Sequence, residues 1–340
     1  MARRPRIGFD LSPQGHAASL GVRRAALELW RALGRRRERF TWVPIAAERG
    51  PSPRVWRQLV LPWRIARERL DGFHSTVSAL PWLARCVLVQ TVHELPWRSG
   101  AVENAGVRHR TWARSRRARA TVVPSVFTRR ALAAERGGDE RGITVVPWGV
   151  GPPFTTTPLV AGGREPLVVA VGATRPKKRL DLVLEIVASC AAAREQRIVV
   201  TGDTRGDEDW LAVCRSEAHR LGVAERLDFA GALTDLELAR LLARASVAIV
   251  ASDSEGFGLP ALEAAACGAP VVVRALGAAE EAAGAAAVPF ASGAKDGAAA
   301  LARALAVDAT VRDDFARAAR TRTWDVAAER IEALWSTLVS

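Results

Sequence analysis

The chain contains no uninterrupted apolar run of the roughly 18 to 20 residues that a membrane-spanning helix needs. Its first residues, MARRPRIGFDLSP, also lack the apolar core of a signal peptide and pass directly into a short strand-like segment. The four cysteines are scattered and form no C-x-x-C pair, which argues against a zinc site, a redox motif or a disulfide framework. We therefore expect a cytoplasmic protein with reduced cysteines.

The length and composition of the chain indicate two domains. At 340 residues it is long for one domain, and 49% hydrophobic residues can supply a core to each of two. Short β-type runs alternate with helical patterns, which favours an α/β fold with parallel sheets covered by helices. The strands expected in the first half are Ile7–Phe9, Thr41–Pro44, Gly72–His74, Val87–Val92, Thr121–Val123 and Ile143–Val146. Those expected in the second half are Leu167–Val171, Ile198–Thr201, Leu227–Phe229, Val247–Val250, Val271–Val273 and Ala287–Pro289.

Residues 153–165, PFTTTPLVAGGRE, are rich in proline, glycine and threonine and show no period, so we expect a linker there. The linker would join two Rossmann-like, doubly wound domains, residues 1–152 and 166–325, and residues 326–340 would form a last helix. Open α/β sheets bind ligands beyond the carboxyl ends of their strands. We therefore expect the functional residues in the loops that follow the strands, facing a cleft.

Positive charge is concentrated in one half of the chain. Residues 1–150 hold 28 Lys and Arg against 11 Asp and Glu, whereas the remainder holds 21 against 25. A strongly cationic surface attracts polyanions such as anionic lipid headgroups, nucleic acid or charged glycans. The alternative is a general preference for arginine, with the side chains spread over solvated helix faces. Tryptophans near arginines in this half fit either a membrane interface or ordinary packing, namely Trp56, Trp63, Trp82 and Trp97.

The most informative stretch is Ile249–Arg274, IVASDSEGFGLPALEAAACGAPVVVR. An apolar run ends at Ser252, a glycine-containing loop follows, and Pro260 opens an alanine-rich segment that stops at Gly268. Proline suits the first helical position and glycine suits the exit from a helix. The pattern predicts a strand, a loop, a helix, a turn and a second strand.

Two glutamates, Glu255 in the loop and Glu263 on the expected first turn of the helix, should frame one ligand site. Glycines let the backbone approach a ligand, and the N–H groups at a helix N-terminus attract phosphate. Carboxylates beside such a site can accept hydroxyls, so the stretch would suit a nucleotide diphosphate attached to a polyol. The alternative is that Glu263 only favours the helix dipole and that Glu255 is a solvated loop charge.

The string SDSEGFGLPALEAAACGAPVV closely resembles the donor-site signature of retaining glycosyltransferases of family 4, the group 1 enzymes of the GT-B fold. The resemblance implies two Rossmann-like domains, a nucleotide-diphosphate sugar as co-substrate and no other cofactor. It also implies that Glu263 binds ribose hydroxyls, that Glu255 contacts sugar hydroxyls near the reacting centre, and that the last helix packs back on the first domain. The donor-binding loop of the family corresponds here to Gly256, Phe257, Gly258 and Leu259.

A basic loop, VGATRPKKRLD at residues 171–181, follows the first strand of the second half. A glycine turn with basic residues at a strand exit can hold a diphosphate through charge-assisted hydrogen bonds, although solvated basic loops are common. With Gly172 as its turn, the loop resembles the family's G-T-x-x-P-R-K-N-L, which places Lys178 on the diphosphate-binding lysine and Lys177 beside it. Ala173 stands where other branches carry arginine, so the phosphate contacts would be shared differently.

The segment QTVHEL at residues 90–95 ends a predicted strand and resembles the family's V-x-T-x-H-D-L. In the family this histidine reaches the donor sugar, and the resemblance gives His93 that role. By itself, a histidine at a strand end is more often a satisfied polar residue. Glu94 replaces the usual aspartate, which keeps the charge and lengthens the side chain.

The loop after the opening strand contains Gly15, His16 and Gly21, and its turn into a helix could approach a phosphate or an acceptor. The family often has G-I-G-R here. This chain has Arg23 in place of the second glycine, which puts one backbone contact in doubt and adds a cation.

Residues 207–209 contain a D-x-D, the metal-binding pattern of a different glycosyltransferase fold. They lie in an acidic turn of the second half and not after a central strand of a single-domain enzyme. We interpret them as solvated and predict no catalytic metal.

Together the patterns predict a retaining, metal-independent hexosyltransferase of polysaccharide biosynthesis, with a nucleotide sugar as donor and a glycan or lipid-linked acceptor. A mannosyl donor is the narrower expectation, because the 171–181 loop is common among mannosyl-transferring enzymes. The expected location is the cytoplasm, at the inner face of an anionic membrane, with no specific nucleic-acid partner. The alternatives are a nucleotide-sugar epimerase of the same fold and a basic polyanion- or membrane-binding protein with a vestigial cleft.

Overall fold

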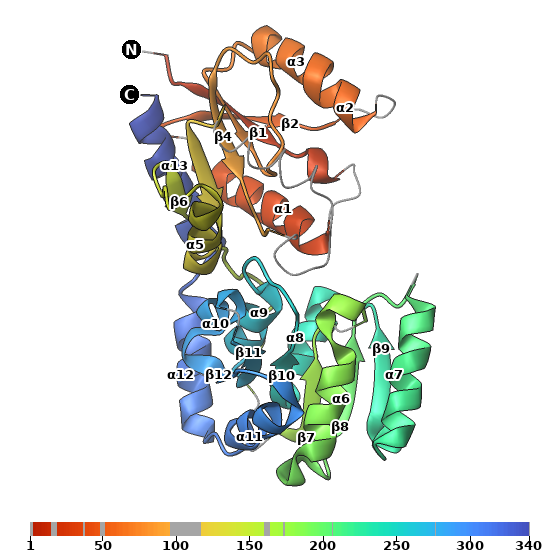
Figure 1. Cartoon of the computed structure of the whole chain (residues 1–340). Helices are drawn as coiled ribbons and strands as arrows, with labels where there is room; N and C mark the ends of the chain where they lie inside the picture. Colours follow the sequence, from red (N-terminus) through yellow and green to blue (C-terminus); the bar gives the residue numbers. More distant parts are fainter. Residues whose placement is uncertain are drawn as a thin grey trace. The chain divides into compact units, whose positions relative to one another are not determined.

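The computed structural model of the chain describes residues 3–14, 19–36, 38–47, 52–95, 117–159, 164–172, 174–205, 207–275 and 277–339 (Figure 1). The chain divides into two compact units. Unit 1 comprises Met1–Gly149 and Thr323–Ser340, and unit 2 comprises Val150–Arg322. The described residues of the predicted linker, 153–159 and 164–165, belong to unit 2, where Phe154 is buried.

Unit 1 contains a six-stranded sheet in the order β2-β1-β3-β4-β5-β6, in which every neighbouring pair is parallel. Its strands are β1 (Arg6–Asp10), β2 (Thr41–Ile45), β3 (Gly72–Ser75), β4 (Val87–Thr91), β5 (Ala120–Val123) and β6 (Ile143–Val145). Its described helices are the 3-10 turn η1 (Ser12–Gln14), α1 (Leu20–Arg35), α2 (Pro53–Val55), the π-helical turn η2 (Trp56–Val60), α3 (Leu61–Arg67), α5 (Val126–Glu135) and α13 (Trp324–Leu338).

Unit 2 contains a second parallel sheet in the order β12-β11-β10-β7-β8-β9. Its strands are β7 (Glu165–Ala170), β8 (Arg197–Thr201), β9 (Leu227–Gly231), β10 (Ala245–Val250), β11 (Val271–Arg274) and β12 (Ala287–Phe290). The principal helices are α6 (Leu180–Ser189), α7 (Glu208–Arg220), α8 (Asp235–Arg244), α9 (Leu259–Ala266), α10 (Ala278–Ala283), α11 (Gly293–Leu305) and α12 (Ala309–Arg320). The predicted α/β class and the two doubly wound parallel sheets are therefore confirmed.

The central strands of unit 2 are buried on both faces. Successive side chains of a strand point to opposite faces, and Val168, Val247 and Ile249 share one apolar cluster with α6, α7 and α11. Val169 and Ala248, which point the other way, are also fully buried. Burial on both sides explains why these strands read as continuous apolar runs in the sequence.

The last helix, α13, packs against α1 and closes unit 1. Its Trp335 is fully buried over β3, where Gly72 leaves room: a Cβ on Gly72 would lie 2.3 Å from the indole ring. The indole Nε1–H donates to His74 Nδ1 at 3.3 Å, so the proton of the neutral imidazole lies on Nε2, 3.2 Å from Thr91 Oγ1. This chain of hydrogen bonds ties the end of the sequence to the middle of the first sheet.

The buried His74 should make unit 1 sensitive to acid. Burial lowers the pKa of His74 from 6.5 to about 3, so between these values the unfolded chain binds a proton that the folded chain does not. Stability therefore falls as the pH drops from 6.5 towards 3, by about 1.4 kcal/mol per pH unit from this group. Urea unfolding at several pH values should show a shallower slope in His74→Gln than in the parent chain. Equal slopes would mean that His74 is not held neutral.

Candidate functional site

The loop between β10 and α9 forms the centre of the candidate site, at the carboxyl edge of the second sheet. Gly258 precedes α9 with φ at +92°, and a Cβ there would lie 2.7 Å from the Cα of Ala279. Glycine is therefore required to turn the chain into the helix. At the other end, Gly268 has φ at +71° and donates to the carbonyl of Ala265, while Ala269 donates to that of Ala264. This is the glycine-terminated helix exit that the sequence predicted.

The structure corrects the predicted position of Glu263. The expected first turn is wrong, because α9 begins at Leu259 and Pro260 is its second residue, so Glu263 is the fifth. The helix starts one residue earlier than proline suggested, since the left-handed Gly258 already completes the turn. Glu263 is nevertheless only 5% exposed. A carboxylate buried to this degree is not a solvated surface charge.

Glu255 and Lys178 meet although they are far apart in the sequence. Lys178 lies at the end of the short helical turn η4 (Pro176–Lys178), and its Nζ donates to Glu255 Oε1 at 2.5 Å. Ser252 Oγ donates to the same oxygen at 2.8 Å. The Lys178 and Glu255 side chains keep 18% and 15% of their surface exposed, so a ligand in solution can still reach them. The structure thus brings together the two loops that the sequence singled out.

The neighbouring glycine turn also lies at this edge. Gly172 follows β7 with φ at +65°, and its N–H donates to Thr201 Oγ1 at the end of β8. No atom of the described residues beyond its two neighbours in the chain lies within 4 Å of where its Cβ would be. In residues 256–259, the apolar side chain of Phe257 is buried and that of Leu259 is half-buried. The polar groups that this loop can offer to a ligand are therefore those of its backbone.

His93 follows β4 in unit 1. Its Nε2–H donates to the Thr76 carbonyl at 2.8 Å, and its ring lies 5.7 Å from that of Trp148. Burial lowers the pKa of His93, against the opposing effect of the Thr76 hydrogen bond. With the proton on Nε2, Nδ1 of the neutral imidazole is a hydrogen-bond acceptor.

The structure gives little evidence on the other site residues expected in unit 1. Gly15 and His16 lie outside the described residues. Gly21 is the second residue of α1, and a Cβ there would meet no atom of the described chain within 4 Å.

Sequence reasoning missed a group of buried polar residues at the same edge of the first sheet. Asp10 is fully buried and accepts from Ser12 N–H at 2.9 Å and Ser75 Oγ at 3.2 Å. Thr76, the acceptor for His93, donates its hydroxyl to the Asp10 carbonyl. The sequence signal that could have indicated these residues is the polar residue at the end of an apolar strand, as at Asp10.

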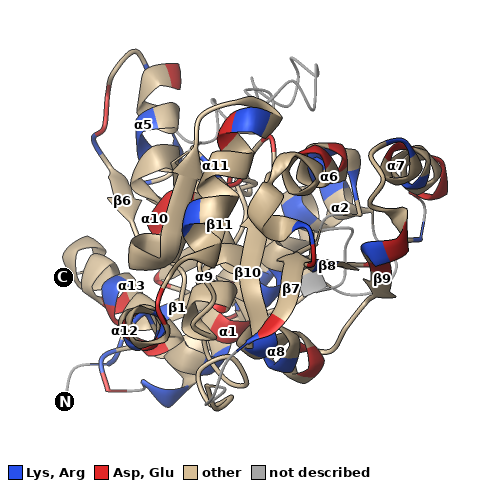
Figure 2. Cartoon of the chain, turned by 90° about the horizontal axis from the view of Figure 1, so that it is seen from below, with Lys and Arg blue, Asp and Glu red and all other residues tan. Residues whose placement is uncertain are grey.

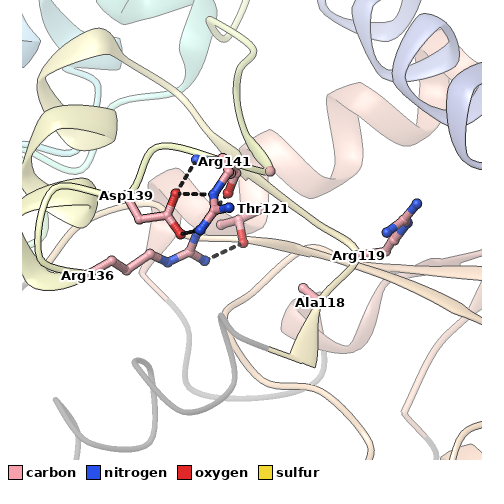
Figure 3. A pocket seen from close by; sticks show the side chains of 7 residues that line it. Ala118, Arg119, Thr121, Arg136, Asp139 and Arg141 are labelled. Carbon is pink, nitrogen blue, oxygen red and sulfur yellow. Dashed lines mark hydrogen bonds and ion pairs between the residues drawn. The ribbon is translucent and has the colours of Figure 1, made fainter.

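A cavity of about 200 Å³ lies at the opposite, amino edge of the first sheet, next to the starts of β5 and β6 (Figure 3). Two of its cations are already bound within the protein. Arg136 donates to Thr121 Oγ1 at 3.2 Å, and Arg141 pairs with Asp139 at 2.9 Å. Arg119 points away from them (Figure 3). Because the cavity lies at the amino edge of the sheet, it is separate from the loops that follow the strands.

The D-x-D residues, Asp207–Asp209, lie at the start of α7, and Glu208 and Asp209 are exposed. In the described part of the chain, no group of three or more His, Cys, Asp or Glu side chains is placed to hold a metal ion. Nor does any described helix have the length and apolar character needed to cross a bilayer.

Comparison with known proteins identifies the class. A family model of group 1 glycosyl transferases matches residues 157–322, and one of glycosyltransferase family 4 matches residues 10–152. The chain therefore belongs to the group 1 glycosyltransferases, with a family 4 N-terminal region, as the sequence resemblance predicted.

Among curated proteins, the chain is similar to D-inositol 3-phosphate glycosyltransferases. It is 39% identical over 117 residues to that of Mycobacterium marinum, a match covering 33% of this chain and 24% of the relative. It is 36% identical over 114 residues to that of Segniliparus rotundus, covering 33% and 25%. The matched segment thus spans about a quarter of the length of these relatives.

Solved structures resemble the whole chain. The sucrose-phosphate synthase of Thermosynechococcus elongatus has a TM-score of 0.74 at 19% identity, covering 98% of this chain and 99% of that one. The Anabaena protein HepE, solved in complex with UDP, has a TM-score of 0.73 at 18% identity, covering 98% and 100%. At such identities the likeness shows the fold alone, which is that of the GT-B glycosyltransferases.

Proposed function

We propose that the protein is a retaining, metal-independent hexosyltransferase that uses a nucleotide-diphosphate sugar. The observation that carries the proposal is the Lys178–Glu255 pair: two loops 77 residues apart place a cation and a carboxylate together, beside the start of α9. A cation beside the N-terminus of a helix suits a diphosphate, and carboxylates suit hydroxyls.

Negative charge grows on the departing diphosphate during transfer. Lys178 and the backbone N–H groups of the 256–259 loop would stabilise that charge, and preorganised donors of this kind usually make the largest contribution to catalysis. Glu263 would hold the ribose hydroxyls and Glu255 those of the sugar, while Nδ1 of His93 would accept from a sugar hydroxyl. The acceptor oxygen bonds to the anomeric carbon on the face that the diphosphate leaves, and its proton passes to the diphosphate, so no further base is needed.

The relatives suggest the substrate class. HepE binds UDP and, in another structure, UDP-glucose, and the curated relatives are named for transfer to D-inositol 3-phosphate. We propose a nucleotide-diphosphate hexose as donor and a hydroxyl of a glycan, a lipid-linked glycan or a polyol phosphate as acceptor. A mannosyl donor, expected from the 171–181 loop, and a role in polysaccharide biosynthesis stay predictions.

Calorimetric titration with GDP, UDP, dTDP and ADP in EDTA tests the donor site. We expect micromolar binding of one nucleotide, which Glu263→Ala weakens by at least about tenfold, or about 1.4 kcal/mol. The exposed Glu225, also in unit 2, provides the matched control, and Glu225→Ala should bind as the parent chain does. If no nucleotide binds, or if Glu263→Ala binds equally well, the donor site is wrongly assigned.

Product analysis then separates the alternatives. A retaining transferase yields a glycoside with the donor's anomeric configuration, only when an acceptor hydroxyl is present, and in EDTA. An epimerase would change the nucleotide sugar without any acceptor. A polyanion-binding protein would show strongly salt-dependent binding that Glu255→Ala leaves unchanged.

We also propose that an apolar face of unit 1 rests on an anionic membrane. The continuous helical run α2, η2 and α3 exposes large apolar side chains four residues apart, with Val55 at 45%, Leu59 at 64% and Trp63 at 56% exposure. Trp82 and Leu83 add 59% and 71%. The side chain of Gln58 is hydrogen-bonded to the backbone of residues 80 and 82, which ties this second segment to the helical run. We take these five exposed residues together as the patch.

The charges around the patch favour an anionic lipid surface over an uncharged one. Residues 52–67 hold four arginines and no acidic residue. The guanidinium of Arg67 lies 5.0 Å from the centre of the Trp63 ring. By contrast, α7 and α8 of unit 2 carry both signs (Figure 2). Of the predicted interface tryptophans, Trp63 and Trp82 are exposed, Trp56 is a fully buried core residue, and Trp97 lies outside the described residues.

Sedimentation with lipid vesicles tests the membrane face. We expect binding to vesicles containing phosphatidylglycerol and little binding to pure phosphatidylcholine. Exchanging both Leu59 and Trp63 for Gln should reduce the binding at least about tenfold, since each buried apolar side chain contributes about 1.5–3 kcal/mol. Leu236→Gln, which changes an exposed leucine of α8, should bind like the parent chain. Equal binding by the double variant would exclude this face.

A further inference from the structure

One aspartate joins three segments of the chain at the candidate donor site. Asp253, in the loop after β10, accepts at Oδ1 from Arg179 Nη1 at 3.2 Å and from Arg274 Nη1. Arg179 comes from the loop after β7, and Arg274 is the last residue of β11. The three side chains are between 25% and 33% exposed, so the contacts are partly shielded from water.

The backbone of Arg179 is unusual. Its φ is +54°, a left-handed conformation that a residue with a Cβ disfavours, and it precedes α6 without a side-chain cap. Its guanidinium donates to both carboxylate oxygens of Asp181, at 2.9 to 3.1 Å, as well as to Asp253. These contacts to two carboxylates hold the Arg179 side chain in place.

The same contacts bracket Lys178. On one side, Asp253 N–H donates to the carbonyl of Lys177 at 2.9 Å. On the other side, Asp253 Oδ1 holds the side chain of Arg179. Glu255, the partner of Lys178, lies two residues beyond Asp253 and is itself fixed by Ser252. Asp253 therefore joins the two loops through the residues on both sides of Lys178.

The charges of the cluster cancel. Arg179 and Arg274 are balanced by Asp181 and Asp253, so the four side chains add no net positive charge for a phosphate. A site that binds a further anion would contain more cationic than anionic side chains. The cluster instead has the features of a rigid brace between loops.

We propose that Asp253, with Arg179 and Arg274, is a positioning residue that holds Lys178 where it can receive the diphosphate of the donor. The inference rests on the proposed function, since it assigns that role to Lys178. It adds residues that do not touch the ligand and act through Lys178.

Lysine is rare enough in this chain to observe the effect directly. The sequence contains three lysines, Lys177, Lys178 and Lys295. Reductive methylation with 13C-formaldehyde keeps their charge and gives few signals, which Lys→Arg variants assign. In the parent protein, the nucleotide identified by calorimetry should shift the Lys178 signal. In Asp253→Asn the ligand-free Lys178 signal should move, and the shift on adding nucleotide should shrink.

Turnover gives the second readout. Misplacement of a group that acts on the leaving diphosphate can cost up to about 100-fold, so we expect kcat in Asp253→Asn to fall by about 10- to 100-fold. Arg274→Gln, which removes one guanidinium, should show the same defect more weakly, and Arg274→Lys should recover part of it. Asp314→Asn, which breaks the exposed Asp314–Arg317 pair of α12, is the control and should match the parent protein.

The outcomes separate the inference from the proposed function. If the parent protein binds no nucleotide, the proposed function itself fails. Suppose that the parent protein binds nucleotide. If Asp253→Asn and Arg274→Gln then leave the Lys178 signal at its parent position and change kcat by less than about twofold, the positioning role is overturned. If Asp253→Asn does not fold, Arg274→Gln and its Lys178 signal decide the question alone.

Discussion

Lys178→Ala is expected to lower kcat for glycosyl transfer by about 100- to 1000-fold, the loss found when one preorganised donor to a developing negative charge is removed. The structure explains why the two neighbouring guanidinium groups should not compensate. Arg179 and Arg274 are occupied by Asp181 and Asp253, and their guanidiniums would have to leave these carboxylates to reach a phosphate. The variant also leaves Glu255 with Ser252 as its remaining described partner.

Steady-state kinetics with saturating donor measures this effect, and thermal unfolding checks that the variant is folded. Lys295→Ala supplies the control, because Lys295 is an exposed residue of α11. A kcat within about threefold of the parent value would show that Lys178 does not act on the leaving group, since the loss of one preorganised donor costs about 100-fold or more.

Trp335→Ala is expected to lower the free energy of unfolding by about 3–5 kcal/mol, the usual cost of removing a fully buried tryptophan side chain. The indole fills the space over Gly72 and donates to His74 Nδ1, so the variant creates a cavity and leaves a buried acceptor without its donor. The loss should appear in the part of the urea transition that belongs to unit 1.

The matched control is Trp63→Ala, which removes the same side chain from a site where it is 56% exposed. Surface changes of this kind usually alter stability by no more than about 0.5 kcal/mol. Similar losses in the two variants would mean that α13 contributes little to unit 1. A loss confined to unit 2 would contradict the assignment of α13 to unit 1.

The fold was predictable from the sequence because both sheets are parallel. Each strand is a short run such as Val247–Val250, bounded by polar or glycine residues, and all twelve occur within two residues of their predicted bounds. The loop from Ser252 to Gly258 was predictable for the same reason, since its glycines mark where the chain must turn. The helical turn on which Glu263 lies was not predictable, because the start of α9 depends on the backbone angles of Gly258.

Contacts between distant segments were beyond the sequence. Nothing in the pattern of the 171–181 loop indicates that Lys178 faces Glu255, or that Arg274 reaches Asp253, because those partners are set by the strand order β11-β10-β7. The same holds for Trp56. Its neighbouring arginines suggested a surface, whereas the side chain is fully buried among apolar residues of unit 1.

The assignment of α13 to unit 1 has a consequence for folding during synthesis. Unit 2 is a continuous segment, Val150–Arg322, set between the two parts of unit 1. A ribosome therefore completes unit 2 before it releases the helix that covers Gly72 and His74. Domains made first usually fold first, but here the first sheet must wait, with its Trp335 site uncovered, until the second unit has emerged.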